Sequence, residues 1–94
     1  MSEIHAEHAI ISGRVQGVWY RAWTRKAALK IGLKGWVRNR TDGTVEAVFC
    51  GTGEQITEML KRCQKGPPLA RVQAIHHTET EIPELQDFEL RSTA

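Results

Sequence analysis

The feature that most constrains this chain is the pair Asp42–Gly43, which separates two segments of strand character. Residues 33–40 and 44–51 each carry several large apolar or aromatic side chains within a short stretch. An Asp-Gly pair between such segments is a strong hairpin signal, because both residues can adopt a positive φ. We therefore predict that the two segments form neighbouring antiparallel strands, around which the rest of the fold has to be built.

One strand and one helix are predicted before the hairpin. Residues 6–13 have the apolar content of a central strand, and residues 20–32 have helical periodicity. Apolar side chains recur at helical spacing in the second segment: Tyr20, Trp23, Ala27 and Ile31. A glycine at position 32 gives this helix a suitable end.

A second helix and two strands are predicted after the hairpin. Thr52 and Gln55 fit a capping box that opens the helix, and the Gly-Pro-Pro run at 66–68 ends it. The helix has an apolar stripe, formed by Ile56, Met59, Leu60 and Cys63. Two further strands complete the pattern, at residues 70–82 and 88–92.

This order predicts an α+β fold of the ferredoxin-like, split β-α-β type (βαββαβ), with an antiparallel sheet and two helices on one face. The whole chain, residues 1–94, is expected to be a single domain. A right-handed first crossover makes strands 6–13 and 33–40 parallel, with strand 44–51 between them. Their carboxyl ends then share one edge of the sheet, where Arg21 and Asn39 become neighbours.

The connection between the first strand and the first helix has the character of an anion site. Gly13 and Gly17 allow sharp turns, and a helix N-terminus attracts negative charge. Arg21 would be unfavourable there alone but is well placed if a phosphoryl group is bound. The alternative is a plain turn with the arginine in water. The amides expected to face the anion belong to Val15, Gln16, Gly17, Val18, Trp19 and Tyr20.

Charge, cysteines and histidines narrow the function further. Residues 14–40 contain eight basic and no acidic side chains although the chain has a net charge of only +2, which favours an anionic ligand. The alternative for Lys26, Lys30 and Lys34 is a solvated helix face. Cys63 lies on the apolar stripe, so a buried free thiol is expected rather than a disulfide with Cys50. The four histidines do not converge, so we expect no metal and no cofactor.

The chain also carries no apolar run of the ~20 residues that a membrane span needs, and its first ten residues lack the basic start of a secretory signal. We therefore expect a cytoplasmic protein that does not enter membranes.

Four segments together resemble the acylphosphatase family: "GRVQGVWYR" at 13–21, "GWVRNRTDGTVE" at 35–46, "GPPLARV" at 66–72 and "FELR" at 88–91. The resemblance covers nearly the whole chain. It implies a ferredoxin-like fold and metal-independent hydrolysis of acyl phosphates, with Arg21 and Asn39 as the catalytic residues. Tyr20 is a mild departure, since phenylalanine is common at its position.

The same resemblance implies a mechanism and a set of partners. The loop amides and Arg21 would hold the phosphoryl oxygens while Asn39 positions the attacking water. The implied partners are a small-molecule acyl phosphate and the product inorganic phosphate, with no nucleic acid and a monomeric enzyme.

Two other functions fit the same order of elements. RNA-recognition modules share it, but "KGWVRN" at 34–39 only echoes their aromatic motif and lies on the wrong strand. A regulatory domain that keeps the fold without turnover is the second, and the presence of both Arg21 and Asn39 argues against it. A structural alternative for Asn39 is an asparagine that prepares the hairpin turn.

Overall fold

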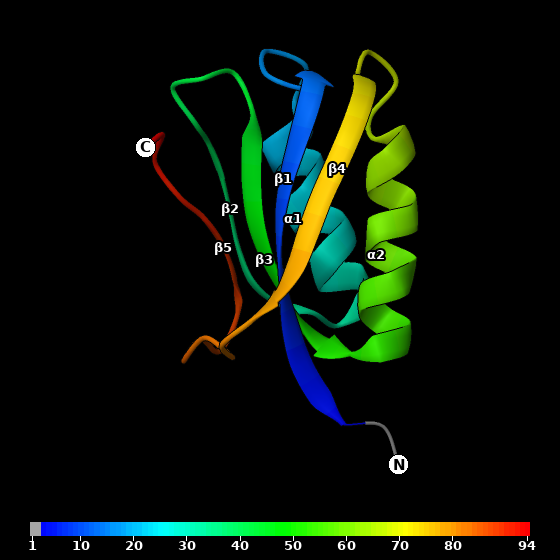
Figure 1. Cartoon of the computed structure of the whole chain (residues 1–94), viewed down its shortest axis with the longest axis vertical. Coiled ribbons are helices and arrows are strands. Elements are labelled where there is room, and N and C mark those ends of the chain that lie inside the picture. Colours follow the sequence, from blue (N-terminus) through cyan, green and yellow to red (C-terminus); the bar gives the residue numbers. More distant parts are fainter. Residues whose placement is uncertain (1–2) are drawn as a thin grey trace.

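The computed structural model of the chain describes residues 3–94 (Figure 1). It contains five strands and two helices. In chain order they are β1 (Ile4–Arg14), α1 (Tyr20–Ile31), β2 (Lys34–Asn39), β3 (Val45–Thr52), α2 (Gly53–Lys65), β4 (Arg71–Thr80) and β5 (Phe88–Leu90). This is the predicted order. The bounds differ from the predicted ones by one or two residues at most ends.

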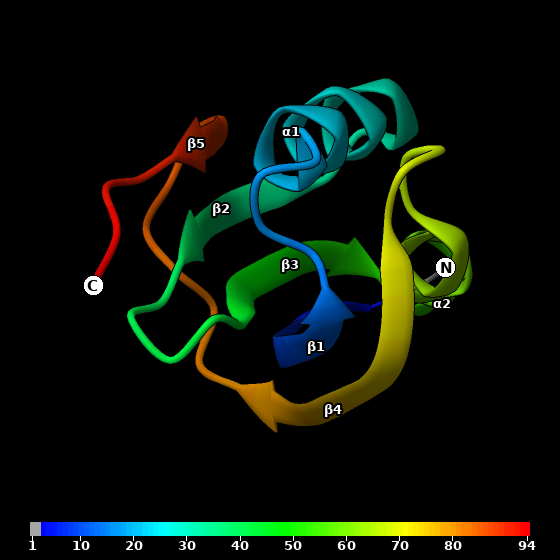
Figure 2. The same ribbon diagram turned by 90° about the horizontal axis from the view of Figure 1, so that it is seen from above.

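The strands form one sheet in the order β4-β1-β3-β2-β5, and both helices pack on one of its faces (Figure 2). Strand β3 lies between β1 and β2 and is antiparallel to both, as predicted. The predicted sheet was antiparallel throughout, whereas β5 pairs with β2 in parallel. The reason is visible in Figure 1: β4 ends at the end of the sheet where β2 begins, so the chain crosses there and enters β5 in the direction of β2.

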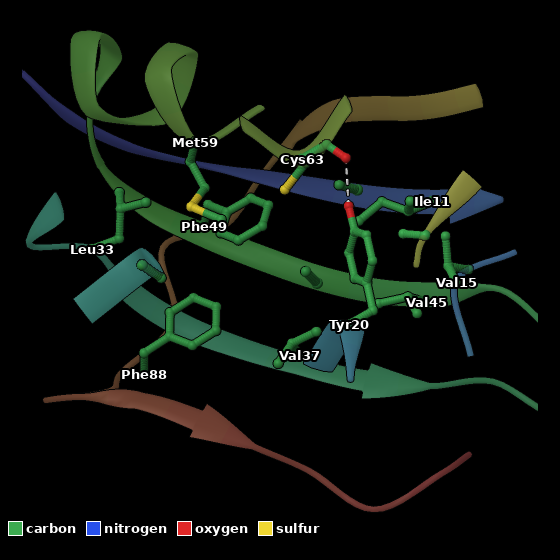
Figure 3. Close-up of a cluster of buried hydrophobic side chains, with 14 of the residues drawn as sticks. Ile11, Val15, Tyr20, Leu33, Val37, Val45, Phe49, Met59, Cys63 and Phe88 are labelled. Carbon is green, nitrogen blue, oxygen red and sulfur yellow. Dashed lines mark hydrogen bonds between the residues drawn. The ribbon is translucent and has the colours of Figure 1, made fainter. Parts of the chain in front are cut away.

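The core fills the space between the sheet and the helices (Figure 3). Phe49 of β3 and Phe88 of β5 stack with ring centroids 5.8 Å apart, which brings the short fifth strand into the core. The stripe of α2 is confirmed, since Ile56, Met59 and Cys63 are buried. In α1 the buried positions are Tyr20, Thr24 and Ala28, and the other predicted apolar residues are only partly buried against the core.

Helix α2 is capped as predicted. The Thr52 hydroxyl accepts a hydrogen bond from the Gln55 N–H at 3.2 Å, and the Gln55 side-chain oxygen accepts one from the Thr52 N–H at 2.9 Å. Both cysteines are buried and free, which confirms the expected thiols. No helix within residues 3–94 is long and apolar enough to cross a membrane.

The hairpin between β2 and β3 is present, but its turn differs from the predicted one. Gly43 alone has a positive φ, of 93°, so the expectation that Asp42 would share it is wrong. The Asp42 carboxylate accepts hydrogen bonds from both the N–H and the hydroxyl of Thr44, at 3.0 and 2.6 Å. Together with the bond from the Arg40 N–H to the Thr44 carbonyl, this makes a three-residue loop with a left-handed glycine.

Candidate functional site

The loop that joins β1 to α1 and the end of β2 lie at the same edge of the sheet, because β1 and β2 run in the same direction (Figure 1). A cavity of about 420 Å³ opens at this edge. Arg21 and Asn39, 18 positions apart in the chain, both line it. The complete lining is Val15, Gln16, Gly17, Trp19, Tyr20, Arg21, Ala22, Asn39 and Leu90.

Most residues of the predicted phosphate loop therefore border one cavity, and Val18 is the exception. The side chains of Val15, Val18 and Tyr20 are buried in the core, and Figure 3 shows Val15 and Tyr20 among the core residues. Their side chains are therefore not available to a ligand. Their burial anchors the loop on both sides of Gly17.

The two loop glycines have different reasons to be glycine. Gly17 has a φ of 73° and open space where a Cβ would lie, so the backbone is accessible there. Gly13 has a φ of 119°, but a Cβ would lie 2.2 Å from the carbonyl oxygen of Arg71. It is needed for the close pairing of β1 with β4, which shifts register at this point. Both glycines thus turn the backbone through a positive φ, and of the two only Gly17 has open space beside it.

The N-terminus of α1 is left without a cap. Its N-cap residue is Trp19, whose side chain makes no capping hydrogen bond, and the first turn contains no acidic residue. Within residues 3–94, the N–H groups of residues 16–19 have no hydrogen-bond acceptor. Helix α2, by contrast, has its capping box and Glu54 in the first turn. The α1 end thus offers unused donors and a partial positive charge to an anion.

Arg21 is held at the cavity by the segment that directly follows β5. Its Nη1 donates to the carbonyl oxygen of Arg91 at 3.3 Å. One turn further on, Arg25 donates through Nε to the carbonyl oxygen of Phe88 at 3.0 Å. A guanidinium has five N–H donors, so Arg21 keeps several for a ligand. No pattern in the sequence indicates this contact, because its acceptor is a backbone carbonyl 70 residues away.

The side chain of Gln16 makes a contact that no pattern in the sequence indicates. Its side-chain nitrogen donates to the carbonyl oxygens of Arg40 and Thr44, both at 2.8 Å. These two carbonyls flank the hairpin turn that follows Asn39. The β1–α1 loop and the end of β2 are therefore joined by hydrogen bonds beside the cavity.

Tyr20 anchors the start of α1 to α2. Its hydroxyl donates to the carbonyl oxygen of Cys63 at 2.6 Å, as the dashed line in Figure 3 marks. Burial raises the pKa of the Tyr20 phenol well above its ordinary value, so the donor proton is retained. This hydroxyl is the part of the residue that departs from the phenylalanine common in the family.

Other polar groups lie outside this cavity. His8 pairs with Glu46 at 2.7 Å, and His77 pairs with Glu7 at 2.8 Å. The part of the chain that the structure describes has no group of three or more His, Cys, Asp or Glu side chains placed to hold a metal ion. Phe49, the aromatic residue of β3, is buried in the core and offers no platform for stacking a nucleotide base.

Comparisons with known proteins agree on one family. Residues 7–90 match the family model described as Acylphosphatase. The acylphosphatase of Rhodopseudomonas palustris is 57% identical over 75 residues, which cover 80% of this chain and 75% of that protein. That of Acidiphilium cryptum is 48% identical over 88 residues, covering 94% and 97%. The structure of an acylphosphatase from Coxiella burnetii is 36% identical and covers 94% and 93%, with a TM-score of 0.90.

Proposed function

We propose that this chain, which belongs to the acylphosphatase family and is an acylphosphatase, hydrolyses the carboxyl–phosphate bond of small acyl phosphates. In the proposed mechanism a positioned water attacks phosphorus in line with the leaving group, and no metal ion takes part. The products are a carboxylate and inorganic phosphate. The observation that carries the proposal is the convergence of Arg21 and Asn39 on one cavity, beside a helix N-terminus that no side chain caps.

The phosphoryl group is bound by the loop and by Arg21. The N–H groups of residues 15–20 and the guanidinium of Arg21 donate hydrogen bonds to its non-bridging oxygens. The helix dipole of α1 adds favourable electrostatic energy at the same place. A fork held by the Arg91 carbonyl is already oriented before the substrate arrives, so little freedom is lost on binding.

The attacking water is positioned by Asn39. Its side-chain amide has both a donor and an acceptor, so it can accept a hydrogen bond from the water molecule and donate one to it. The water oxygen forms a bond to phosphorus as the bond from phosphorus to the acyl oxygen breaks, and the electron pair of that bond leaves with the carboxylate. The water loses one proton to the solvent or to the phosphoryl oxygens. Catalysis consists of positioning and electrostatic stabilisation.

The leaving group explains why no acidic or basic side chain is needed. The conjugate acid of a carboxylate has a pKa of about 4, so the carboxylate departs unprotonated. A general acid would contribute little to such a step. Among the nine residues that line the cavity, Arg21 is the only one with a charged side chain.

The test is hydrolysis of benzoyl phosphate by the purified protein in the presence of a chelator. We expect turnover that the chelator does not reduce and that inorganic phosphate inhibits competitively, because the product occupies the phosphoryl site. Turnover that disappears on chelation and returns with a divalent metal would refute the metal-free mechanism. Binding of phosphate without any turnover would instead identify a regulatory domain that keeps the fold alone.

A further inference from the structure

Trp19 is the most exposed large apolar side chain of the described residues, with 81% of its surface accessible. It is also the only non-glycine residue within 3–94 that has a positive φ, of 66°. This left-handed conformation is disfavoured for a bulky side chain. The fold therefore holds an indole in water, on a backbone that a glycine or asparagine would adopt more easily.

Neither packing nor capping accounts for this indole. The neighbouring aromatic residues Tyr20 and Trp23 pack against each other with centroids 5.4 Å apart, and Trp19 takes no part in that pair. As the N-cap of α1 it makes no side-chain hydrogen bond. Trp19 borders the cavity, and aromatic side chains that line a cavity are typical of binding sites.

The position of the indole indicates what it binds. Trp19 lines the same cavity as Arg21 and Asn39, and so does Leu90, which is 45% exposed. The lining of the cavity thus combines polar groups, among them Arg21 and Asn39, with the apolar side chains of Trp19 and Leu90, which come from opposite ends of the chain.

We infer that Trp19, together with Leu90, forms the subsite for the acyl group and makes the enzyme selective for acyl phosphates whose acyl group is apolar, aromatic ones above all. The inference rests on the proposed hydrolysis of acyl phosphates. An acyl phosphate has one anionic end and one end that varies, and the lining of this cavity contains groups suited to each. An aromatic acyl group can stack on the indole, whereas an acetyl group is too small to cover it.

The first experiment compares benzoyl phosphate with acetyl phosphate in two variants. Trp19→Asn removes the indole and keeps a residue that tolerates a positive φ. We expect its KM for benzoyl phosphate to rise roughly three- to tenfold. Trp19 also belongs to the loop that binds the phosphoryl group, so any disturbance of that loop should affect both substrates alike. The diagnostic quantity is therefore the ratio of the two KM values, which should rise because only the benzoyl group contacts the indole. Trp19→Phe should keep most of the preference for the benzoyl substrate.

The matched control is Ile82→Asn. Ile82 is also an exposed apolar residue, at 53%, but it lies in the connection between β4 and β5, at the other end of the sheet (Figure 1). This variant should behave as the wild type on both substrates. If Trp19→Asn raises KM equally for both substrates, or for neither, the acyl subsite is wrong. If the wild-type protein hydrolyses neither substrate, the proposed function itself has failed, and the subsite with it.

A second measurement does not depend on the folding of any variant. Phenylphosphonate and methylphosphonate share an anionic head and differ in their apolar group. We expect the wild-type protein to bind phenylphosphonate several-fold more tightly by calorimetry. Equal affinities, with both ligands competing with inorganic phosphate, would show that the cavity has no apolar subsite.

Discussion

Arg21 lies in the first turn of α1, where the partial positive charge of the helix opposes a cation. The structure adds a reason why this cation is an arginine rather than a lysine. One guanidinium nitrogen is bound to the Arg91 carbonyl, which fixes the plane of the fork and leaves the remaining donors free for a ligand. A lysine ammonium has no such plane and cannot be oriented by one backbone contact while it binds two oxygens.

Arg21→Lys is therefore expected to lose most of the activity, although it keeps the charge. We expect kcat/KM for benzoyl phosphate to fall by at least roughly 10²-fold, with affinity for inorganic phosphate reduced as well. Steady-state kinetics and phosphate calorimetry measure the two effects. The control is Arg62→Lys, since Arg62 is an arginine on the exposed side of α2 whose side chain pairs with Glu58. Near-normal activity in Arg21→Lys would show that the bidentate role is wrong.

Asn39 is assigned to the attacking water, so its removal should separate turnover from binding. In Asn39→Ala we expect kcat and kcat/KM to fall together by roughly 10²-fold or more, because ground-state binding by the loop and Arg21 is untouched. Phosphate affinity should remain close to that of the wild type.

The backbone of Asn39 also has a structural role, because its carbonyl accepts a hydrogen bond from the Ala94 N–H at 3.1 Å. A urea unfolding curve of Asn39→Ala is the control. If phosphate binding disappears while the urea midpoint is unchanged, Asn39 grips the anion rather than the water. If the midpoint collapses, the residue serves the hairpin.

At the scale of elements, the site depends on the contact between the β1–α1 loop and the β2–β3 hairpin. Gln16 makes it through two hydrogen bonds from one side-chain nitrogen. Both amide protons are used, and both acceptors are backbone carbonyls. This contact sets how far the loop amides lie from Asn39.

Gln16→Glu tests the contact with almost no change in shape. The glutamate replaces the donating nitrogen with an oxygen, which faces two carbonyl oxygens and is repelled by them. We expect the free energy of unfolding to fall by about 1–3 kcal/mol. We also expect kcat to fall, because the loop is no longer held at a fixed distance from Asn39. Gln86→Glu, the same change at an exposed position in the β4–β5 connection, should alter neither quantity. An active, fully stable Gln16→Glu would show that the loop holds its position without the hairpin.

Tyr20 connects α1 to α2. Its hydroxyl bonds to a carbonyl group that has no partner within α2. In α2 the carbonyl of Cys63 would bond to the N–H of residue 67, but that residue is Pro67, which has none. The Tyr20 hydroxyl donates to this carbonyl instead. Gly66 provides the space, because a Cβ there would lie 2.6 Å from the Tyr20 ring. The start of α1 and the end of α2 are therefore matched to each other.

At the scale of the whole molecule, most of the fold follows from local signals. The hairpin, the capping box and the helical periodicities are each contained in fewer than about 20 consecutive residues. Together they predict the order of elements and the neighbourhood of Arg21 and Asn39. The parallel pairing of β5 could not be predicted in this way, because its three residues are too few to form a pattern that indicates a partner strand. Its position depends on Phe88 packing into the core.

The contacts that position the site could not be predicted from the sequence either. Arg21 bonds to a carbonyl 70 residues away, and Gln16 bonds to carbonyls 24 and 28 residues away. A backbone carbonyl is present at every residue, so the acceptor leaves no mark in the sequence. The position of the turn at Asp42 was predicted correctly, but its type was not. The Asp42 carboxylate accepts a hydrogen bond from Thr44, and the Asp42 backbone does not adopt a positive φ.

The same core has a consequence for the stability of the whole molecule at alkaline pH. Burial raises the pKa of the Cys63 thiol to about 12, and it also raises the pKa values of Cys50 and Tyr20. In the unfolded chain a thiol ionises near pH 9.0 and a phenol near pH 10.0. Above pH 9.0 the unfolded state therefore holds fewer protons than the folded state, and rising pH favours unfolding.

The free energy of unfolding should thus be insensitive to these three groups up to about pH 8 and fall from pH 9.0 onward, with Cys63 contributing until about pH 12. Each group adds up to about 1.4 kcal/mol per pH unit to the slope. Urea unfolding under reducing conditions between pH 7 and 11 measures it. Cys63→Ala and Tyr20→Phe each remove one titrating group and one buried contact, so each variant should be less stable than the wild type at pH 7. Cys63→Ala should then lose stability less steeply above pH 9.0, and Tyr20→Phe less steeply above pH 10.0. A slope in Cys63→Ala equal to that of the wild type would mean that the thiol ionises alike in both states, and that its burial has no effect on the alkaline limit of the fold.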